Sequence, residues 1–368
     1  MTEWFTTVVL ALLAYSYVFY PLTLVLRKRL ASEKAPLPSD HPLPPATLLI
    51  LARNEQSAIE QKLSQVAALD YPELSVMVIS DGSDDETATL ARNHYSKPHV
   101  IEFDTPRGKT IATLEALERV ETDLLFFTDA PGVLATNSLH ILGTTLVSEG
   151  VGCAGGRVFY GDPRTELEAG FGLYQRIARA VRDAEGAGGT ATVISGAIHG
   201  AWRSVIPTVP GSLSLELAIP LETTLQNKKS VYVAEAICVE ESRKTWGSEW
   251  KARLRMGMRS WAFLLHLLAY TPGLLGTRYL FHFWSHKGLR WLGGPLCMIL
   301  FISGELGGLQ TLLLLIGGLS VGEKLFGKSR LVSLLIFFFL VNGAYALSLS
   351  LFILGKRQPS WKPERPVE

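Results

Sequence analysis

The chain has 368 residues, of which 48% are hydrophobic and 19% are charged, and its formal net charge is +1. A near-neutral charge excludes the strongly basic surface typical of nucleic-acid-binding proteins, so we expect no nucleic-acid partner. The hydrophobic excess lies in the first thirty residues and after about residue 260, which leaves a middle part with the composition of a globular domain. Cys153, Cys238 and Cys297 follow no metal-ligand spacing, which is typical of small buried side chains in a reducing compartment.

An apolar run begins the chain. Residues 4–26 have about the length needed to cross the hydrocarbon core of a bilayer, and the basic triplet Arg27-Lys28-Arg29 follows directly. By the positive-inside rule, this triplet stays in the cytoplasm. A secretory signal peptide is the alternative, but Glu3 stands where such a peptide carries basic residues. We therefore predict a transmembrane helix in residues 1–30, followed by a proline-rich linker in residues 31–45.

Strand-like and helix-like segments alternate from residue 46 onwards. Short apolar segments typical of buried strands are separated by stretches with helical periodicity. The strand-like segments are 47–52, 74–80, 100–103 and 124–128, and the helical ones are 55–69, 85–95 and 109–120. This order predicts an α/β domain in residues 46–247, with a mostly parallel sheet and helices on both of its faces.

Three of the expected strands end in polar turns, which are Arg53-Asn54-Glu55, Ser80-Asp81-Gly82-Ser83 and Thr128-Asp129-Ala130. Ligands of open parallel sheets bind beyond the carboxyl ends of the strands, so we expect these turns to lie at one edge. Carboxylates and the amides at helix starts suit a nucleotide and a divalent cation. Each turn taken alone is equally typical of an ordinary helix N-cap. No Gly-x-Gly-x-x-Gly motif follows the first strand, and no complete Walker-type loop is present in the sequence.

The last third of the chain is again rich in apolar residues. Residues 248–291 interleave basic with aromatic residues, which is typical of amphipathic helices in the lipid headgroup layer. A buried amphipathic helix of the globular domain is the alternative. Residues 292–355 predict two transmembrane helices, and residues 356–368 form a basic tail. The positive-inside rule then predicts a multi-pass protein of the inner cell membrane whose globular domain and tail are cytoplasmic.

The order of these motifs resembles the membrane-bound, inverting family 2 glycosyltransferases of the GT-A fold. The resemblance covers nearly the whole chain from about residue 46 and rests on Ala52-Arg53-Asn54-Glu55, Tyr71-Pro72, Ser80 to Thr87, Gly108-Lys109, Thr128-Asp129-Ala130, Ser195-Gly196-Ala197, Glu216 to Leu221 and Ser285-His286-Lys287. It implies that a sugar is transferred with inversion from a nucleoside diphosphate sugar, with a UDP-sugar favoured. The implied acceptor is a polysaccharide or a lipid, and the implied setting is a membrane, with room for a partner in a synthase complex.

The resemblance also implies roles for single residues. Contacts to the donor fall to residues of the first two polar turns, to a lysine at a helix start and to an arginine-rich helix: Asn54, Glu55, Asp81, Lys109, Arg255, Arg259 and Trp261. Asp129 stands at the first acid of a metal-binding Asp-x-Asp motif, which implies Mg²⁺ or Mn²⁺ as cofactor. Glu216 stands where an acidic residue acts as the catalytic base. Read without the resemblance, Glu216 also fits a solvated acid in a first helical turn, and the two arginines fit contacts to lipid headgroups.

The motifs depart from the family pattern at three places. Pro131 replaces the second acid of the Asp-x-Asp motif, Leu215-Glu216 replaces an acidic pair, and Ser260 separates an arginine from a tryptophan where the family has Gln-x-x-Arg-Trp. One carboxylate, diphosphate oxygens and water molecules still suffice as ligands for Mg²⁺. A catalytically silent relative, which binds nucleotide sugar or serves as a scaffold in polysaccharide assembly, is the alternative to an active enzyme. A nucleotidyltransferase is disfavoured, because the first polar turn holds no glycine.

Overall fold

The computed structural model describes residues 3–30, 42–161, 170–240, 246–302 and 330–356. The chain divides into two compact units. Of the described residues, the sheet unit comprises 42–161 and 182–240, and the helical unit comprises 3–30, 170–181, 246–302 and 330–356.

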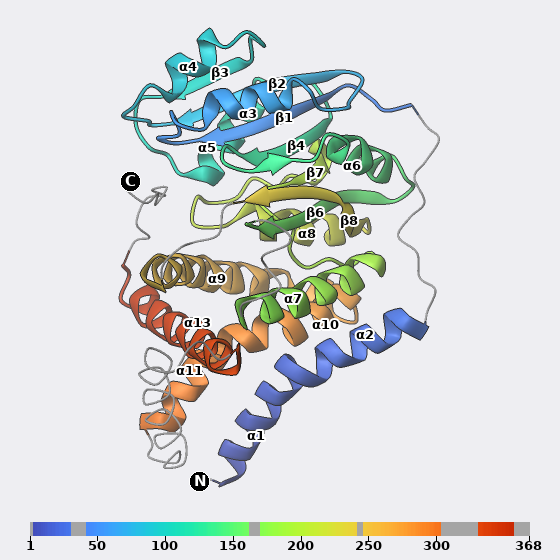
Figure 1. The fold of residues 1–368 in the computed structure, drawn as a ribbon. Helices are drawn as coiled ribbons and strands as arrows, with labels where there is room; N and C mark the ends of the chain where they lie inside the picture. The colour runs from blue at the N-terminus through green and yellow to red at the C-terminus, as the bar shows by residue number, and fades with distance from the viewer. Residues whose placement is uncertain (1–2, 31–41, 162–169, 241–245, 303–329, 357–368) are drawn as a thin grey trace. The chain divides into compact units, whose positions relative to one another are not determined.

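A mixed eight-stranded sheet forms the sheet unit, with the strand order β3-β2-β1-β4-β7-β6-β8-β5 (Figure 1). The strands are β1 (Ala46–Ala52), β2 (Leu74–Asp81), β3 (His99–Phe103), β4 (Leu124–Asp129), β5 (Val133–Leu134), β6 (Val151–Tyr160), β7 (His199–Trp202) and β8 (Lys229–Glu240). The predicted α/β class is confirmed. The sheet is less parallel than expected, because β7 runs antiparallel to both β4 and β6, and β5 runs antiparallel to β8. Strand direction depends on long-range pairing, which the local periodicity of a segment does not contain.

Helices cover both faces of the parallel half of the sheet, which explains why its strands read as continuous apolar runs. All seven residues of β1 are buried. Leu48 and Ile50 pack in one core cluster with α3 (Ile59–Val66), whereas Leu49 packs in a second cluster with α5 (Lys109–Leu117). Successive residues of a strand point to opposite faces, so a buried strand between two helical layers must be apolar throughout.

The remaining elements of the sheet unit complete these two layers. They are α4 (Thr87–Asn93), α6 (Ser138–Leu146), the 3₁₀ turn η2 (Arg203–Val205) and α8 (Leu215–Leu225). The order of strands and helices expected for residues 46–128 is confirmed. The expected helices are longer than the observed ones; the helix predicted over 55–69, for example, is α3.

The helical unit contains the described elements α1 (Glu3–Ala14), the π-helical turn η1 (Tyr15–Phe19), α2 (Tyr20–Leu30), α9 (Trp246–Leu274), α10 (Arg278–Phe283), the π-helical turn η3 (Trp284–Gly288), α11 (Leu289–Ile302) and α13 (Arg330–Ile353). It also contains the first part of α7 (Gly170–Ala187), up to Val181. Most of the middle membrane span predicted after residue 292 falls on residues 303–329, which lie outside the described part of the chain. The same holds for most of the expected linker and tail.

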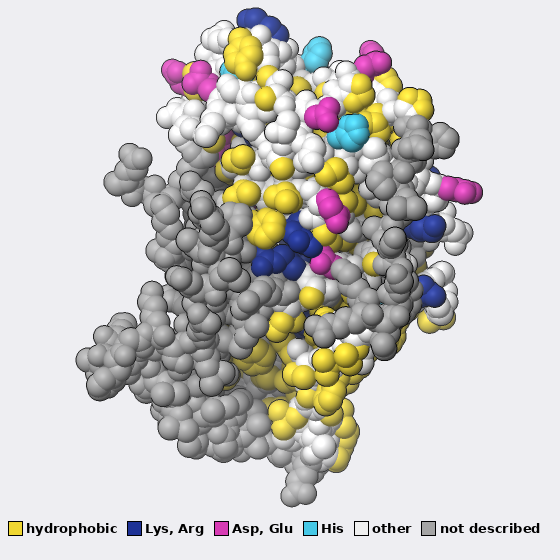
Figure 2. All heavy atoms as spheres, turned by 45° about the vertical axis from the view of Figure 1, so that its right-hand side comes forward, with side chains coloured by type: hydrophobic (Ala, Val, Ile, Leu, Met, Phe, Trp, Pro, Cys, Tyr) yellow, Lys and Arg dark blue, Asp and Glu magenta, His cyan; other side chains and the backbone are white. Residues whose placement is uncertain are grey.

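One apolar helix in the described part of the chain is long enough to cross a membrane. It is Trp4–Leu26, with 23 residues and a mean hydropathy of 2.0, and Phe337–Ile353 within α13 is a shorter apolar helix. Large apolar side chains along the first helix are exposed, namely Trp4, Val8, Leu10, Leu12, Val18, Phe19, Leu22 and Leu26. On the face drawn in Figure 2, hydrophobic side chains gather over the helical unit.

Five aromatic residues of α9 to α11 are buried, namely Trp261, Phe263, Tyr279, Phe283 and Trp291, whereas Tyr270 and Phe281 are exposed. Phe263 and Phe283 are fully buried, and Trp291 lies against both of their rings. The indole nitrogen of Trp261 donates a hydrogen bond to Ser348 Oγ of α13 at 2.8 Å. These buried side chains therefore pack helix against helix. The predicted placement of residues 248–291 in the headgroup layer stays a prediction.

Candidate functional site

The three polar turns follow β1, β2 and β4, which are neighbouring parallel strands. Ala52 of β1 pairs with Ser80 of β2, and Leu51 pairs with Asp129 of β4. The strands therefore end at the same level, and the turns lie at the carboxyl edge of the sheet, as the sequence predicted.

Hydrogen bonds join the first polar turn to the second. Asn54 adopts a left-handed backbone conformation with φ of 53°, its Oδ1 accepts from the amide of Asp84 at 2.8 Å, and its own amide donates to Ser83 Oγ at 3.2 Å. The next residue, Glu55, is buried, and its amide donates to Thr87 Oγ1 at 2.8 Å. The predicted donor contacts of Asn54 and Glu55 stay predictions; the geometry shows that both residues shape one rigid double turn.

Asp81 anchors the loop that leads into α5. Its side chain is fully buried, and its two carboxylate oxygens accept from the amides of Arg107 at 2.7 Å and Gly108 at 2.9 Å. Gly82 is required beside it, because its φ is +61° and a Cβ there would stand 2.4 Å from the backbone nitrogen of Pro106. Asp81 thus positions Lys109, the first residue of α5, and its predicted contact to the donor stays a prediction.

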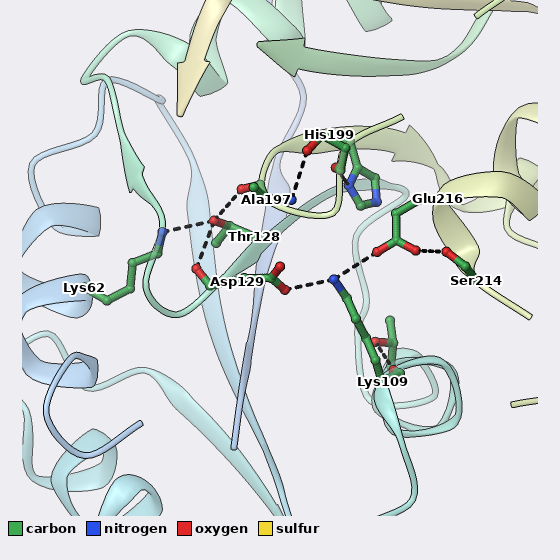
Figure 3. A network of polar contacts seen from close by, with 10 residues as sticks. Lys62, Lys109, Thr128, Asp129, Ala197, His199, Ser214 and Glu216 are labelled. Atoms are coloured by element: carbon green, nitrogen blue, oxygen red, sulfur yellow. Dashed lines mark hydrogen bonds and ion pairs between the residues drawn. The ribbon is translucent and has the colours of Figure 1, made fainter. Parts of the chain in front are cut away.

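Lys109 joins the two acids that the sequence singled out. Its Nζ lies 2.8 Å from Asp129 Oδ1 and 2.9 Å from Glu216 Oε1, and Ser214 donates to the other oxygen of Glu216 (Figure 3). The three charged side chains are only 15–25% exposed. Residues far apart in the chain, at the starts of α5 and α8 and the end of β4, therefore form one polar cluster.

One further hydrogen bond and one glycine allow this cluster to form. Thr110 Oγ1 donates to the carbonyl of Leu213 at 2.6 Å, which ties the start of α5 to the segment before Glu216. Gly196 leaves the space in which the ions meet, since a Cβ there would lie 2.5 Å from Glu216 Oε1 and 2.7 Å from Lys109 Nζ. The glycine of the Ser195-Gly196-Ala197 segment, on which the resemblance partly rests, is therefore required for steric reasons in this chain.

The cluster sets the charge of its members. Burial by itself would raise the pKa of Glu216, but the Lys109 ammonium and the Ser214 hydroxyl outweigh burial and hold that pKa well below its usual range. Burial would likewise lower the pKa of Lys109, but the carboxylates of Asp129 and Glu216 outweigh it and raise that pKa. In this state Glu216 is a fully ionised carboxylate and a weak base.

His199 of β7 lies beside Glu216 and was not singled out from the sequence. Its ring stacks on Phe127 with centroids 4.6 Å apart, and its Nδ1 lies 2.7 Å from the carbonyl oxygen of Ser195. Burial lowers the pKa of His199 to about 4, with a smaller opposing effect from Glu216 and a smaller lowering effect from Lys109. The ring is therefore neutral at neutral pH. A lone histidine in a short strand gives no sequence signal for such a place.

The depressed pKa of His199 predicts a loss of stability in mild acid. Between pH 6.5 and about 4 the unfolded chain binds a proton at this ring that the folded chain does not, so the free energy of unfolding should fall as the pH falls. The fall attributable to His199 should reach up to about 3 kcal/mol. Urea unfolding at pH 7 and pH 4.5 should show a smaller acid loss in His199→Phe than in the unmodified chain; an equal loss would contradict the prediction.

Lys62 of α3 lies beneath the turn that carries Asp129 and was also missed from the sequence. Its ammonium donates to Thr128 Oγ1 at 3.0 Å and to the carbonyl of Gly132, and so bridges both ends of the turn. Burial lowers the pKa of Lys62 to about 8, although the nearby Cys238, Asp129 and Glu240 oppose the shift. A lysine on the same helical face as Ile59, Leu63 and Val66 is the sequence signal that could have revealed it.

A small cavity connects these side chains. Its volume is about 20 Å³, enough for one water molecule or one hydroxyl group, and its lining includes Lys109, Phe127, Gly196, His199 and Glu216. In the described part of the chain, no three His, Cys, Asp or Glu side chains gather in a metal-binding group. Asp129 therefore offers a single side-chain carboxylate to a metal, consistent with the missing second acid at Pro131.

Arg255, Arg259 and Trp261 belong to α9 of the helical unit and are not part of the cluster in the sheet unit. The indole N–H of Trp261 is used in packing against α13, as described above. Their predicted contacts to the donor stay predictions. Of the expected site residues, the structure brings together Lys109, Asp129 and Glu216, with Asp81 holding the loop before Lys109.

Comparison with known proteins finds a family match and several relatives. Residues 47–201 match the family model described as "Glycosyl transferase family 2". The poly-beta-1,6-N-acetyl-D-glucosamine synthase of Staphylococcus epidermidis is 23% identical over 274 residues, which cover 70% of this chain and 64% of that protein. The synthase of the same name from Staphylococcus aureus is 25% identical over 229 residues, covering 57% of this chain and 53% of that protein. The chain thus spans less than two thirds of the length of these relatives.

A solved structure shares the fold over almost the whole chain. The mannosyltransferase PcManGT from Pyrobaculum calidifontis, solved in complex with GDP-Man and Mn²⁺, superposes with a TM-score of 0.72 at 18% identity. The match covers 96% of this chain and all of that one. The α/β sheet with its flanking helices is therefore GT-A-like.

Proposed function

The chain carries a domain of glycosyl transferase family 2 in residues 47–201, and on this premise we propose that it transfers a sugar, with inversion, from a nucleoside diphosphate sugar to a polysaccharide or lipid acceptor. The observation that carries the proposal is the Lys109 ammonium placed between Asp129 and Glu216 at the carboxyl edge of the sheet. The cation faces a ligand's phosphates there, and a carboxylate stands ready for the acceptor.

Glu216 is the proposed general base, and Lys109 controls it. As a partner of Lys109 and Ser214, Glu216 has a lowered pKa and takes up a proton poorly. A bound diphosphate offers Lys109 a more highly charged partner, which draws the ammonium away from Glu216 and restores the basicity of the carboxylate. The base then accepts the proton of the attacking hydroxyl while Lys109 stabilises the departing diphosphate.

Asp129 is the proposed protein ligand of a divalent cation, Mg²⁺ or Mn²⁺. The fit rests on one partly exposed carboxylate at the end of β4, with diphosphate oxygens and water completing the shell, as Mg²⁺ commonly accepts. The presence of Mn²⁺ in the PcManGT complex supports a divalent ion at this fold. When bound, the cation supplies positive charge to the diphosphate.

The donor follows from the relatives only as a class. The names of the staphylococcal synthases support N-acetylglucosamine as the sugar, the family resemblance favours a UDP-linked donor, and the PcManGT complex holds GDP-Man. Thermal unfolding of the full chain in detergent with UDP-GlcNAc, UDP-Glc or GDP-Man, each with and without Mg²⁺ or Mn²⁺, tests the proposal. The true donor should raise the midpoint by mass action. No shift with any of a full set of nucleotide sugars would overturn it.

A catalytically silent relative is the second candidate. It is favoured by Pro131, which replaces the second acid of the Asp-x-Asp motif, and by the lowered pKa of Glu216, which makes this carboxylate a weak base. Such a protein would bind donor, and a partner in a synthase complex, without turnover. Release of nucleoside diphosphate from bound donor in the presence of saccharide and lipid acceptors separates the two: an enzyme releases it, and a silent relative does not.

Asp81→Ala should weaken donor binding by roughly 1–3 kcal/mol, because the amides of Arg107 and Gly108 lose their buried acceptor and the loop that presents Lys109 is released. Calorimetric titration with donor measures the effect. Asp84→Ala is a suitable control, since that residue contributes its backbone amide to Asn54 and its exposed side chain lies in the same double turn. Equal donor affinity in Asp81→Ala and the unmodified chain would refute the role.

The proposed location is a membrane, with the sheet unit on the cytoplasmic side. Support comes from the apolar helix Trp4–Leu26, its exposed apolar side chains and the basic triplet after it. A reporter fused after Glu368 should be active only on the cytoplasmic side. Activity only on the outer side would refute this topology.

A further inference from the structure

One nitrogen of His199 is not accounted for by the packing of the site. His199 is only 2% exposed, and its Nε2 has no hydrogen-bond partner among the residues that the structure describes. The rest of the ring is fully used: one face stacks on Phe127, and Nδ1 meets the carbonyl of Ser195. Buried polar atoms are rarely left without a partner, and such an atom beside a reaction site points to a ligand.

The bonding of Nδ1 decides what Nε2 can do. A carbonyl oxygen only accepts hydrogen bonds, so Nδ1 carries the hydrogen and donates it to Ser195. Burial keeps the ring neutral by lowering the pKa of His199 to about 4, so Nε2 bears a lone pair. The missing partner must therefore donate a hydrogen.

Neither side-chain donor of the cluster serves this lone pair. The Lys109 ammonium is bonded to Asp129 and Glu216, and the Ser214 hydroxyl is bonded to Glu216. Figure 3 shows the ring of His199 directed toward the carboxylate of Glu216, and both residues line the same small cavity. The cavity thus presents two hydrogen-bond acceptors side by side, a carboxylate and an imidazole lone pair.

We propose that Nε2 of His199 accepts a hydrogen bond from a second hydroxyl of the acceptor, next to the hydroxyl that Glu216 deprotonates, so that the acceptor is a saccharide and not a lipid phosphate. The proposal rests on the proposed function, since it takes Glu216 as the base. A hydroxyl has one hydrogen and can serve only one of the two acceptors, so two neighbouring hydroxyls are needed. One fits the small cavity beside Nε2, and the other meets Glu216, whose side chain is 15% exposed.

A phosphate acceptor lacks the matching chemistry. At neutral pH a phosphate monoester carries between one and two negative charges and exposes mainly acceptor oxygens. Placed between Glu216 and the lone pair of His199, it would meet one like charge and one further acceptor. The Lys109 ammonium lines the same cavity, but in the proposed function the donor diphosphate engages it. A sugar presents several hydroxyls close together, such as the 4- and 6-hydroxyls of a hexose, and satisfies both. His199 is therefore a residue that selects the acceptor.

The test uses the full chain in detergent with UDP-GlcNAc as donor and two acceptor probes. One probe is a β-1,6-linked N-acetylglucosamine pentamer, with a matched pentamer lacking the terminal 4-hydroxyl beside the attacking 6-hydroxyl. The other is a short polyprenyl phosphate. His199→Phe keeps the stacking ring and removes both nitrogens, and His199→Gln restores a side-chain acceptor. His94→Phe is the matched control, because His94 is a buried histidine of the same unit whose two ring nitrogens meet Ser64 and Ser96.

We expect His199→Phe to bind donor like the unmodified chain and to raise the KM for the pentamer about 10–100-fold, the cost of one buried hydrogen bond. His199→Gln should recover part of this loss, and His94→Phe should leave this KM unchanged even where its thermal stability falls. The 4-deoxy pentamer should be poor with the unmodified chain and no worse than the intact pentamer with His199→Phe. Polyprenyl phosphate should receive little sugar.

Three outcomes would overturn the inference. Unchanged KM for the pentamer in His199→Phe, with donor binding and stability retained, would mean that Nε2 has no role in acceptor binding. Polyprenyl phosphate accepting sugar at least as efficiently as the pentamer would mean that the acceptor class is wrong while the proposed function stands. Donor binding without transfer to any acceptor would instead show that the proposed function itself has failed, and this inference with it.

Discussion

Replacing Glu216 by Gln is expected to lower turnover about 10²–10⁴-fold and to leave donor binding intact, because the amide keeps the shape of the side chain and cannot take up a proton. The structure sharpens this expectation. Glu216 accepts from Lys109 and Ser214, and its backbone carbonyl accepts from the amide of Ile194, so the start of α8 remains anchored in the variant. Single-turnover transfer from pre-bound donor, with donor affinity from calorimetry, measures the two effects separately.

Glu222→Gln is the matched control for this variant. Glu222 is the other acid of α8, and its Oε1 accepts from Gln226 at 2.9 Å one helical turn away, outside the cluster around Lys109. Turnover should be unchanged in the control. Full turnover in Glu216→Gln would show that another group is the base. A drop in donor affinity equal to the drop in turnover would mean that Glu216 serves donor binding through Lys109 and not proton transfer.

Replacing Asp129 by Asn should weaken donor and metal binding together and lower kcat/KM by at least about 100-fold, equivalent to roughly 3 kcal/mol. The amide cannot balance the charge of Lys109, and it removes the one side-chain carboxylate that the turn offers to a metal. Calorimetric titration with Mn²⁺ in the presence of nucleoside diphosphate, and with donor in the presence of Mn²⁺, gives the two affinities.

Asp123→Asn serves as the control, because Asp123 is an exposed acid just before the opposite end of β4. It should change neither affinity. Pro131→Asp provides a second variant for this test. An added acid two residues after Asp129 should raise metal affinity if the turn still binds a cation. Unchanged metal-dependent donor binding in Asp129→Asn would show that Asp129 is only the partner of Lys109.

The behaviour of these variants depends on a cluster whose parts carry very different sequence signals. Asp129 ends an apolar strand, and that position alone predicted its place at the ligand edge. Lys109 and Glu216 were found through the resemblance to a family and not through any local pattern. His199 was missed, because a single histidine in a four-residue strand gives no local signal. Lys62 was missed although its place on the apolar face of α3 was a usable signal. Their burial follows from contacts with Phe127 and Thr128, which lie far from them in the chain.

The local hydrophobic pattern of the sequence by itself determined the order and type of the elements in the first half of the domain. Continuous apolar runs indicate strands buried on both faces, and helical periodicity between them indicates covering helices, so β1 to β4 and their polar turns could be predicted in order and type. Only the tertiary structure decided the antiparallel course of β7, which brings His199 next to Phe127, and the approach of α8 to α5, which brings Glu216 to Lys109. The physical reason is that hydrophobic periodicity reports only which face of an element is buried. Strand direction and ion pairing depend on which distant segment of the chain packs against that face.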